Sequence, residues 1–496
     1  MSSLEELSAQ ALVRDAAAPA VEFGGRWIDW GALRQVADRV GALIDASGAS
    51  PHAVIALVPR NRPSAIAALL GLIAKGHSVR MVYAFQSGAA LAREIERLGP
   101  AVIIAAEEDY SEELTCVLRA QGTAAIALQE MGANGVPGLA RSTITTVAPA
   151  SASRNIELLT SGTTGPPKPF AMSFDSIARY FVSSNPTQPA RSQKGTASQA
   201  PPFLLFMPLG NISGVYSTLP VLLRGQRAVL LERFSVAGWH DYVLRYRPEI
   251  AGLPPAGVQM VLDANIPPSD LAGIRSIGTG AAALDPSTQR AFEERYGIPI
   301  LLSYGATEFA GPVTAMTADL HAQWGQKKLG SVGRALPGAQ LRVIDPNTGA
   351  LLPPGEEGLL EVISPRIGPD WIRTSDIVVI DDDGFMFHRG RADGAIMRGG
   401  FKLLPETIER ALLLHESISA AAVSGIHDQR LGQVPAAAIQ LKAGVERPRV
   451  DELEAHLRKH VYATHIPVRW RFVEDLPRTP SLKVDRRALQ ALLESE

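Results

Sequence analysis

The sequence predicts an α/β protein: a large N-terminal domain of parallel α/β subdomains plus a small antiparallel β unit, followed by a small mobile α+β C-terminal domain. Three observations support this prediction. Short apolar runs alternate with helical patterns from the N-terminus onward. From about Gly330, glycines and prolines recur between short alternating strands. Beyond Asp393 the chain has a further helix and strands of its own.

The first part of the chain carries the parallel α/β signals. Segments with helical periodicity are 30–46, 63–75 and 214–224. Apolar runs typical of buried strands are 53–58, 101–106, 203–207 and 227–231. Alternation of strands with helices favours parallel sheets with right-handed crossovers. Residues 185–200 are rich in Ser, Gln, Pro and Ala, which predicts a surface loop.

The later part carries antiparallel signals. Asp383-Gly384 is a strong hairpin-turn pair between two alternating runs. After it, the sequence predicts a helix at 405–415 and strands at 420–423, 436–441 and 469–473. We therefore expect an N-terminal domain at 1–390, a hinge at 391–394 and a C-terminal domain at 395–496.

Composition restricts the class of protein. The chain has 496 residues, 46% of them hydrophobic, and a formal net charge of −2, so nothing suggests a nucleic-acid or membrane-surface binder. The apolar run 65–74 is too short to span a bilayer, and the N-terminus does not resemble a signal peptide. The single cysteine, Cys116, excludes an internal disulfide, and its helical surroundings predict a buried or half-buried structural thiol. We expect a cytoplasmic protein.

One segment, Thr160 to Lys168, is the strongest functional signal. Its glycines allow close backbone approach to a ligand, and its hydroxyls, N–H groups and lysine suit phosphate oxygens. The order differs from that of a Walker loop. A flexible Ser/Thr/Gly surface loop is the alternative. The predicted phosphate-binding residues are Thr160, Ser161, Gly162, Thr163, Thr164, Gly165 and Lys168.

Four further motifs follow in order: Ser303 to Glu308 (SYGATE), Trp371 to Asp376 (WIRTSD), Gly390 to Asp393 with Gly399 to Lys402, and Pro480 to Lys483. Together with TSGTTGPPK they resemble the adenylate-forming superfamily. This superfamily includes acyl- and aryl-CoA ligases, adenylation domains of peptide synthetases, luciferase-like enzymes and some amide-bond synthetases. The resemblance runs from about Arg26 to Leu493.

The resemblance implies roles for individual residues. Tyr304 lies against adenine, Thr307 contacts the α-phosphate and Glu308 holds Mg²⁺. Lys483 bridges carboxylate and phosphate, so Lys483, Thr307 and Glu308 form the predicted catalytic set. Adenine and ribose are expected to contact Gly280, Ala281, Ala282, Tyr304, Asp376 and Arg391. The acyl pocket is expected to include Asn211, Ile212, Ser213, Gly280 and Gly305. Asp393 matches the hinge, and the thiol or amine channel matches Gly399, Gly400 and Lys402.

The sequence departs from the family pattern at several places. Asn211 stands where a histidine is common, and it cannot change charge near neutral pH. Pro169, Ser375 and Leu482 each replace a usual glycine, and the segment before Asp376 is shortened. A turn residue for Asp376 or Asp393, and a surface lysine for Lys483, are the structural alternatives.

The resemblance implies an ATP- and Mg²⁺-dependent ligase with coenzyme A as the co-substrate. A carboxylic acid would become an acyl-adenylate, with release of pyrophosphate, and CoA would then accept the acyl group. An amide-bond synthetase using an amine, and an adenylation enzyme that loads a separate carrier protein, are alternatives. From a different class, a non-catalytic nucleotide-binding regulator is a further alternative. We expect no nucleic-acid or membrane partner.

Overall fold

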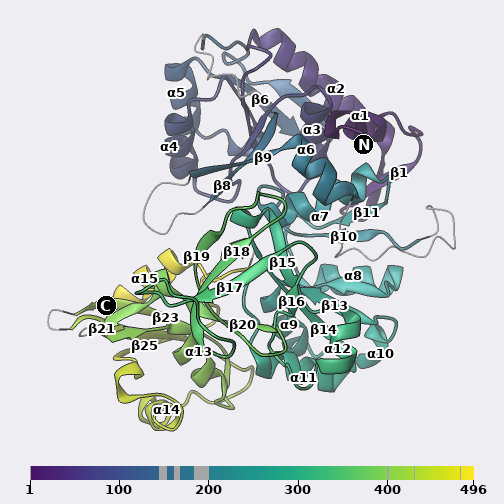
Figure 1. The fold of residues 1–496 in the computed structure, drawn as a ribbon. Coiled ribbons are helices and arrows are strands. Elements are labelled where there is room, and N and C mark those ends of the chain that lie inside the picture. Colours follow the sequence, from purple (N-terminus) through teal and green to yellow (C-terminus); the bar gives the residue numbers. More distant parts are fainter. Residues whose placement is uncertain are drawn as a thin grey trace. The chain divides into compact units, whose positions relative to one another are not determined.

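The computed structural model describes residues 2–144, 154–160, 168–183, 200–398, 401–428, 431–480 and 482–495. These residues form two compact units, Met1–Tyr246 and Arg247–Glu496. Figure 1 labels the elements of both. No helix in the described ranges is long and apolar enough to cross a membrane. The predicted hinge at 391–394 falls inside the second unit, and the predicted domain limits stay a prediction.

The first unit is built around a seven-stranded sheet of order β7-β6-β5-β3-β4-β8-β9. Its five central strands are parallel, and the two edge strands β7 and β9 run antiparallel to their neighbours. The strands are β3 (Ile55–Val58), β4 (Val79–Met81), β5 (Val102–Ala106), β6 (Ala124–Gln129), β7 (Gly132–Gly135), β8 (Asn155–Thr160) and β9 (Lys168–Ser173). The predicted parallel α/β character of this region is confirmed.

Helices cover this sheet. In Figure 1, α4 lies beside α5, and α2 lies with α3 on the other side of the strands. The helices are α1 (Leu4–Leu12), α2 (Trp30–Ser47), α3 (Pro63–Ala74), α4 (Gly88–Leu98), α5 (Glu112–Gln121) and α6 (Phe174–Ile177). On α5, Leu114 and Leu118 are buried one turn apart, whereas Cys116 lies between them in sequence and is exposed. The expectation of a buried or half-buried thiol was wrong because Cys116 falls on the outer face of the helix.

A second, four-stranded sheet in the same unit has the order β10-β11-β1-β2. Its strands are β1 (Pro19–Phe23), β2 (Arg26–Asp29), β10 (Phe203–Leu205) and β11 (Ala228–Leu230), with helices α7 (Ile212–Leu223) and α8 (Val236–Tyr246). The strands predicted at 203–207 and 227–231 are present but shorter. The β1–β2 hairpin was missed, although Gly24 and Gly25, which have positive φ, mark its turn.

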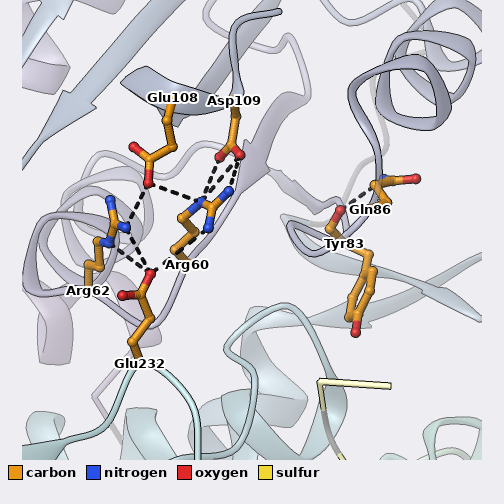
Figure 2. A network of polar contacts seen from close by, with 7 residues as sticks. All are labelled: Arg60, Arg62, Tyr83, Gln86, Glu108, Asp109 and Glu232. Atoms are coloured by element: carbon orange, nitrogen blue, oxygen red, sulfur yellow. Dashed lines mark hydrogen bonds and ion pairs between the residues drawn. The ribbon is translucent and has the colours of Figure 1, made fainter. Parts of the chain in front are cut away.

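An ion-pair network joins the segments that follow strands β3, β5 and β11 (Figure 2). The Arg60 guanidinium donates to both carboxylate oxygens of Asp109, with Nη2 2.6 Å from Oδ1. Arg62 reaches Glu108 and Glu232 at 2.6 and 2.9 Å. Hydrogen bonding to Asp109 is the largest cause of the raised pKa of Arg60. The network therefore links residues that follow strands of both sheets.

The second unit begins with a five-stranded sheet of order β12-β13-β14-β15-β16, parallel through β14 and then antiparallel. Its strands are β12 (Ile250–Gly252), β13 (Ser276–Thr279), β14 (Ile300–Ala306), β15 (Gly311–Ala315) and β16 (Arg334–Ala335). Its helices are α9 (Pro255–Asp263), α10 (Pro268–Leu271), α11 (Pro286–Tyr296) and α12 (Ala318–Trp324).

An antiparallel sheet follows, as the sequence predicted. Its strands are β17 (Gln340–Ile344), β18 (Glu357–Ile363), β19 (Ile372–Ile380) and β20 (Met386–Arg391). The turn between β19 and β20 contains Gly384 at φ 77°, and the Gly384 N–H donates to the carbonyl of Asp381. This geometry confirms the turn predicted from Asp383-Gly384.

The last part of the chain forms its own sheet of order β22-β21-β24-β23, with β25 parallel to β24. The strands are β21 (Ile396–Arg398), β22 (Phe401–Leu403), β23 (Ile418–Asp428), β24 (Gly432–Leu441) and β25 (Arg469–Val473). Helices α13 (Pro405–Leu413) and α14 (Val450–Leu457) share one apolar core with it, and α15 (Arg486–Glu494) contributes to another. The predicted helix and all three predicted strands are present, and β23 and β24 extend beyond the predicted limits.

Candidate functional site

The site in the second unit starts from two neighbouring parallel strands, β13 and β14. The segments 278–282 and 304–308 lie at their carboxyl ends, where ligands commonly bind in α/β sheets. Ala281 has φ 69°, which is uncommon for a residue other than glycine. A side chain on Gly280 would collide with Ser303, and one on Gly305 would collide with the backbone of Gly311 and Pro312. Packing alone therefore requires glycine at both positions, because neither leaves space for a side chain.

Tyr304 and Asp376 form the centre of the site. The Tyr304 hydroxyl, on β14, donates to Oδ2 of Asp376, on β19, at 2.5 Å. Asp376 is 8% exposed, and its backbone N–H donates to the hydroxyl of Thr374. The pair brings together two residues that the sequence assigned separately to adenine and ribose.

Two further side chains flank the Asp376 carboxylate. Nε2 of His388 lies 3.2 Å from Oδ1, and Nη1 of Arg391 lies 3.9 Å from the same oxygen. Arg391 also donates from Nη2 to the hydroxyl of Ser375 at 2.6 Å. The ring of His388 lies 5.9 Å from that of Tyr304, tilted by 31°. His388 belongs to none of the sequence motifs, and no signal in the local pattern singled it out.

These contacts determine the charge state of the pair. Burial raises the pKa of Asp376, but hydrogen bonds from His388 and Tyr304 and the Arg391 charge outweigh it and hold that pKa below its ordinary value. Burial, followed by the Asp376 charge, raises the pKa of Tyr304. Near neutral pH the site therefore holds an ionised carboxylate and a protonated phenol.

Lys483 lies in a tight turn near the C-terminus. Its carbonyl accepts from the N–H of Thr479 at 2.7 Å, and the Leu482 N–H donates to the Thr479 carbonyl at 2.8 Å. Nη1 of Arg478 donates to the Leu482 carbonyl at 3.1 Å. Leu482 itself has φ 60°, in the left-handed region that favours glycine. The backbone therefore adopts the left-handed conformation at this position although the residue is leucine.

Lys483 is close enough to the site for the two regions to interact electrostatically. Lys483 as a whole residue is exposed, but protein atoms surround its ammonium group. The resulting desolvation is the main cause of its lowered pKa. Arg391 lowers the pKa further, while Glu308 and Asp376 raise it. The lysine from the last motif therefore shares one electrostatic environment with residues of the three preceding motifs.

Glu308 and Thr307 lie in a 3₁₀ turn, Thr307–Phe309, directly after β14. Glu308 is exposed, and within the described part of the chain its carboxylate makes no hydrogen bond or ion pair. The same residues contain no cluster of three acidic, histidine or cysteine side chains that could hold a metal. A single free carboxylate still fits Mg²⁺, which commonly binds one or two carboxylates together with substrate phosphates and water.

The other predicted residues are described less completely. Thr160 ends β8 opposite Lys168, the first residue of β9, but their side chains and all of Ser161, Gly162, Thr163, Thr164 and Gly165 lie outside the described residues. Gly399, Gly400 and the side chain of Lys402 do so as well. The backbone of Asp393 lies in a 3₁₀ turn, Ala392–Gly394.

In the first unit, Asn211 directly precedes α7 and is half-buried, as are Ile212 and Ser213, the first residues of the helix. The Asn211 side chain makes no capping hydrogen bond to the helix. Gly214, one residue further on, could not carry a side chain without colliding with the Pro208 carbonyl. The chain therefore enters α7 closely against the backbone of residues 208–209.

The fold and the order of the site segments are those of adenylate-forming enzymes. The AMP-binding enzyme family matches residues 8–369, and the AMP-binding enzyme C-terminal domain matches residues 407–483. The chain belongs to the AMP-binding enzyme family.

Curated relatives include a sulfoacetate–CoA ligase of Cupriavidus necator, 32% identical over 67% of this chain and 66% of that protein. A 4-coumarate–CoA ligase of Narcissus pseudonarcissus is 32% identical over 68% of this chain and 64% of that protein. The matches thus span slightly less than two thirds of each relative.

Solved structures share the fold over almost the whole chain. The anthranilate CoA ligase AuaEII in complex with anthranoyl-AMP has a TM-score of 0.77 at 19% identity, covering 99% of this chain and 97% of that one. The amide bond synthetase McbA from Marinactinospora thermotolerans has a TM-score of 0.74 at 23% identity, covering 99% of both chains.

Proposed function

We propose that the protein is an ATP-dependent, AMP-forming carboxylic acid ligase that uses coenzyme A as acceptor. A carboxylate oxygen of the acid attacks the α-phosphorus of ATP, the bond to the bridging oxygen breaks, and pyrophosphate leaves. The thiol of CoA then attacks the acyl carbon, and AMP leaves. The observation that carries the proposal is the buried Asp376 carboxylate, at which Tyr304, Asp376 and Arg391 bring residues of three of the motifs together.

The residues of the site suit the first step. Asp376 accepts hydrogen bonds from the ribose hydroxyls, and Tyr304 offers its ring to adenine. Lys483 supplies positive charge where negative charge develops between carboxylate and phosphate. Thr307 can donate its hydroxyl to the α-phosphate. Gly280, Ala281 and Ala282 border the nucleotide, and the Thr160–Lys168 segment binds the leaving phosphates.

Magnesium is proposed as the metal that accompanies ATP, held by Glu308 and the phosphates. It neutralises charge on the phosphate oxygens when it is bound. Glu308 would hold it through one exposed carboxylate, so its binding would depend on the nucleotide. We further propose Asp393 as the hinge, Gly399, Gly400 and Lys402 as the thiol channel, and the cytoplasm as the site of action.

The direct test is pyrophosphate release across a panel of aromatic and aliphatic acids, with ATP and Mg²⁺. We expect release that depends on one class of acid and stops when Mg²⁺ is chelated. Lys483→Ala should slow it about 10²–10³-fold, since it removes one preorganised charge. Lys459→Ala is the matched control, because Lys459 is an exposed lysine of the same region.

Two results would overturn the proposal. Unchanged release by Lys483→Ala would remove the catalytic assignment. Tight ATP binding without turnover on any acid would instead indicate a nucleotide-binding regulator.

An amide-bond synthetase is the second candidate. It is favoured by Asn211, which replaces the common histidine in the expected acyl pocket, and by the short segment before Asp376, the expected ribose contact. Product analysis with CoA and with amines separates the two. Acyl-CoA as product supports the ligase, an amide supports the synthetase, and acid-dependent release without either product directs attention to a carrier protein.

A further inference from the structure

His388 is a half-buried neighbour of the nucleotide site to which the motifs give no function. Its side chain is 21% exposed, and that of Asp376 is 11% exposed. The two meet with Nε2 3.2 Å from Oδ1. An ionised carboxylate can only accept, so Nε2 must carry the proton and donate it. His388 therefore presents an Nε2–H donor to the Asp376 carboxylate.

A β-bulge brings His388 to this position. In β20, His388 pairs with Val378 and Arg391 pairs with Asp376, while Ile377 pairs with Gly390, so the register shifts between Ile377 and Val378. In a regular strand, residues three apart point to opposite faces. The extra residue returns Arg391 to the face of His388, so both side chains flank one carboxylate.

Gly390 makes this bulge possible. Its φ of 151° is a conformation that side chains disfavour, and a Cβ there would require the Glu406 carboxylate to shift. The convergence of His388 and Arg391 on Asp376 is thus a built feature of the β19–β20 pair.

The hydrogen bonds of the carboxylate leave room for a ribose. A carboxylate offers about four acceptor positions. Tyr304 occupies one on Oδ2 and His388 occupies one on Oδ1. About two acceptor positions remain, the number that two ribose hydroxyls need. Because the two protein donors bind different oxygens, they fix the rotation of the carboxylate about its bond to Cβ.

We propose that His388 is a positioning residue for nucleotide recognition: its Nε2–H fixes the Asp376 carboxylate so that both ribose hydroxyls can donate to it. This inference rests on the ribose-binding role of Asp376 in the proposed function. Without the histidine donor, the remaining contact of Oδ1 among the described residues is the charge of Arg391 at 3.9 Å. The carboxylate then rotates, and it accepts the two hydroxyls less well.

The test compares ribose with deoxyribose. Isothermal titration calorimetry without any carboxylic acid gives the Kd of the protein for ATP, 2′-deoxyATP and 3′-deoxyATP, each with Mg²⁺. Wild-type protein should bind each deoxynucleotide about tenfold or more weakly than ATP, as expected for a lost hydrogen bond to a charged group. The ratio of the Kd for each deoxynucleotide to the Kd for ATP measures this discrimination. His388→Leu should weaken ATP binding and reduce this Kd ratio at least about threefold.

Two conservative variants isolate the donor. His388→Gln carries an N–H near the position of Nε2, and it should retain the wild-type ratio. His388→Asn is also polar and neutral but too short to reach Oδ1, so it should behave like His388→Leu. A purely structural histidine would change the Kd values for all three nucleotides by the same factor. Because Gln and Asn are both polar amides, their comparison stands even where the leucine variant fails to fold.

Each outcome decides one point. A ratio in His388→Asn equal to that of wild type overturns the positioning role. An equally reduced Kd ratio in His388→Gln and His388→Asn also overturns it. The hydrogen-bond donor would then not be the required property of the histidine. A wild-type protein that binds ATP and both deoxynucleotides equally refutes the ribose role of Asp376, and with it that part of the proposed function.

Discussion

The hydroxyl of Tyr304 donates a 2.5 Å hydrogen bond to Oδ2 of Asp376, and this contact joins two different sheets of the second unit. One residue is proposed to contact adenine and the other ribose. Since the two side chains bond directly, a change in either affects the other. Their contributions to ATP binding should therefore be coupled rather than additive.

The Tyr304→Phe variant tests this coupling. It removes the hydroxyl but keeps the ring, so ATP affinity should fall about tenfold, the cost of one hydrogen bond to a charged group. Calorimetric titration of Tyr304→Phe, Asp376→Asn and the double variant should give a combined effect smaller than the sum of the two. Tyr296→Phe is the control, since its hydroxyl bonds to the Ile266 carbonyl instead of the site. Strictly additive effects would contradict the coupling.

The sequence proposed its candidate site residues through local motifs. The chain order of SYGATE, WIRTSD and the C-terminal lysine pointed to Tyr304 and Asp376, which the structure brings into direct contact, and to Lys483, and the roles of all three stay predictions. The antiparallel unit and β25 were also predictable, since alternation and turn residues are local signals.

Contacts between distant segments could not be predicted in this way. The Tyr304–Asp376 hydrogen bond joins residues that are 72 positions apart. His388 reaches the carboxylate only because of a bulge, and a bulge is an irregularity that periodicity conceals. The β1–β2 hairpin has a local turn signal at Gly24-Gly25, but the parallel pairing of β1 with β11, about 200 residues later, has none.

Leu482 offers a test of backbone strain. Its φ of 60° costs a residue other than glycine about 1–2 kcal/mol, whereas glycine's extra unfolded-state entropy costs about 0.5–1 kcal/mol. Leu482→Gly should therefore be about 0.5–1 kcal/mol more stable than Leu482→Ala, which has the same strain as leucine. Denaturant unfolding measures the difference between these two variants. A less stable glycine variant would show that the left-handed conformation is not the dominant cost.

The Arg60–Asp109 pair should be the most sensitive part of the network in Figure 2. The Asp109 side chain is only 5% exposed, so Asp109→Asn leaves the charge of a largely buried Arg60 without its main partner. We expect a loss of about 3 kcal/mol in the free energy of unfolding. Glu130→Gln is the matched control at the exposed Arg26–Glu130 pair and should cost at most about 1 kcal/mol. Equal losses would show that burial does not determine the strength of these pairs.

The pKa of Lys483 provides a test that does not depend on turnover. Desolvation and the Arg391 charge lower it from the ordinary value of 10.5, and Glu308 and Asp376 oppose them. Between the lowered pKa and pH 10.5, Lys483 is therefore neutral in the folded protein and charged in the unfolded chain. The pH dependence of acetylation of Lys483, followed by mass spectrometry, reports this pKa.

Two variants should move that pKa in opposite directions. Arg391→Met removes a cation that lowers the pKa, so the midpoint of the acetylation curve should move to higher pH. Glu308→Gln removes an anion that raises the pKa, so the midpoint should move to lower pH. Lys459, an exposed lysine of the same region, serves as the internal reference for the extent of acetylation. Because a general change in folding would move both variants in the same direction, opposite shifts can only come from charges that act on Lys483 within the folded site.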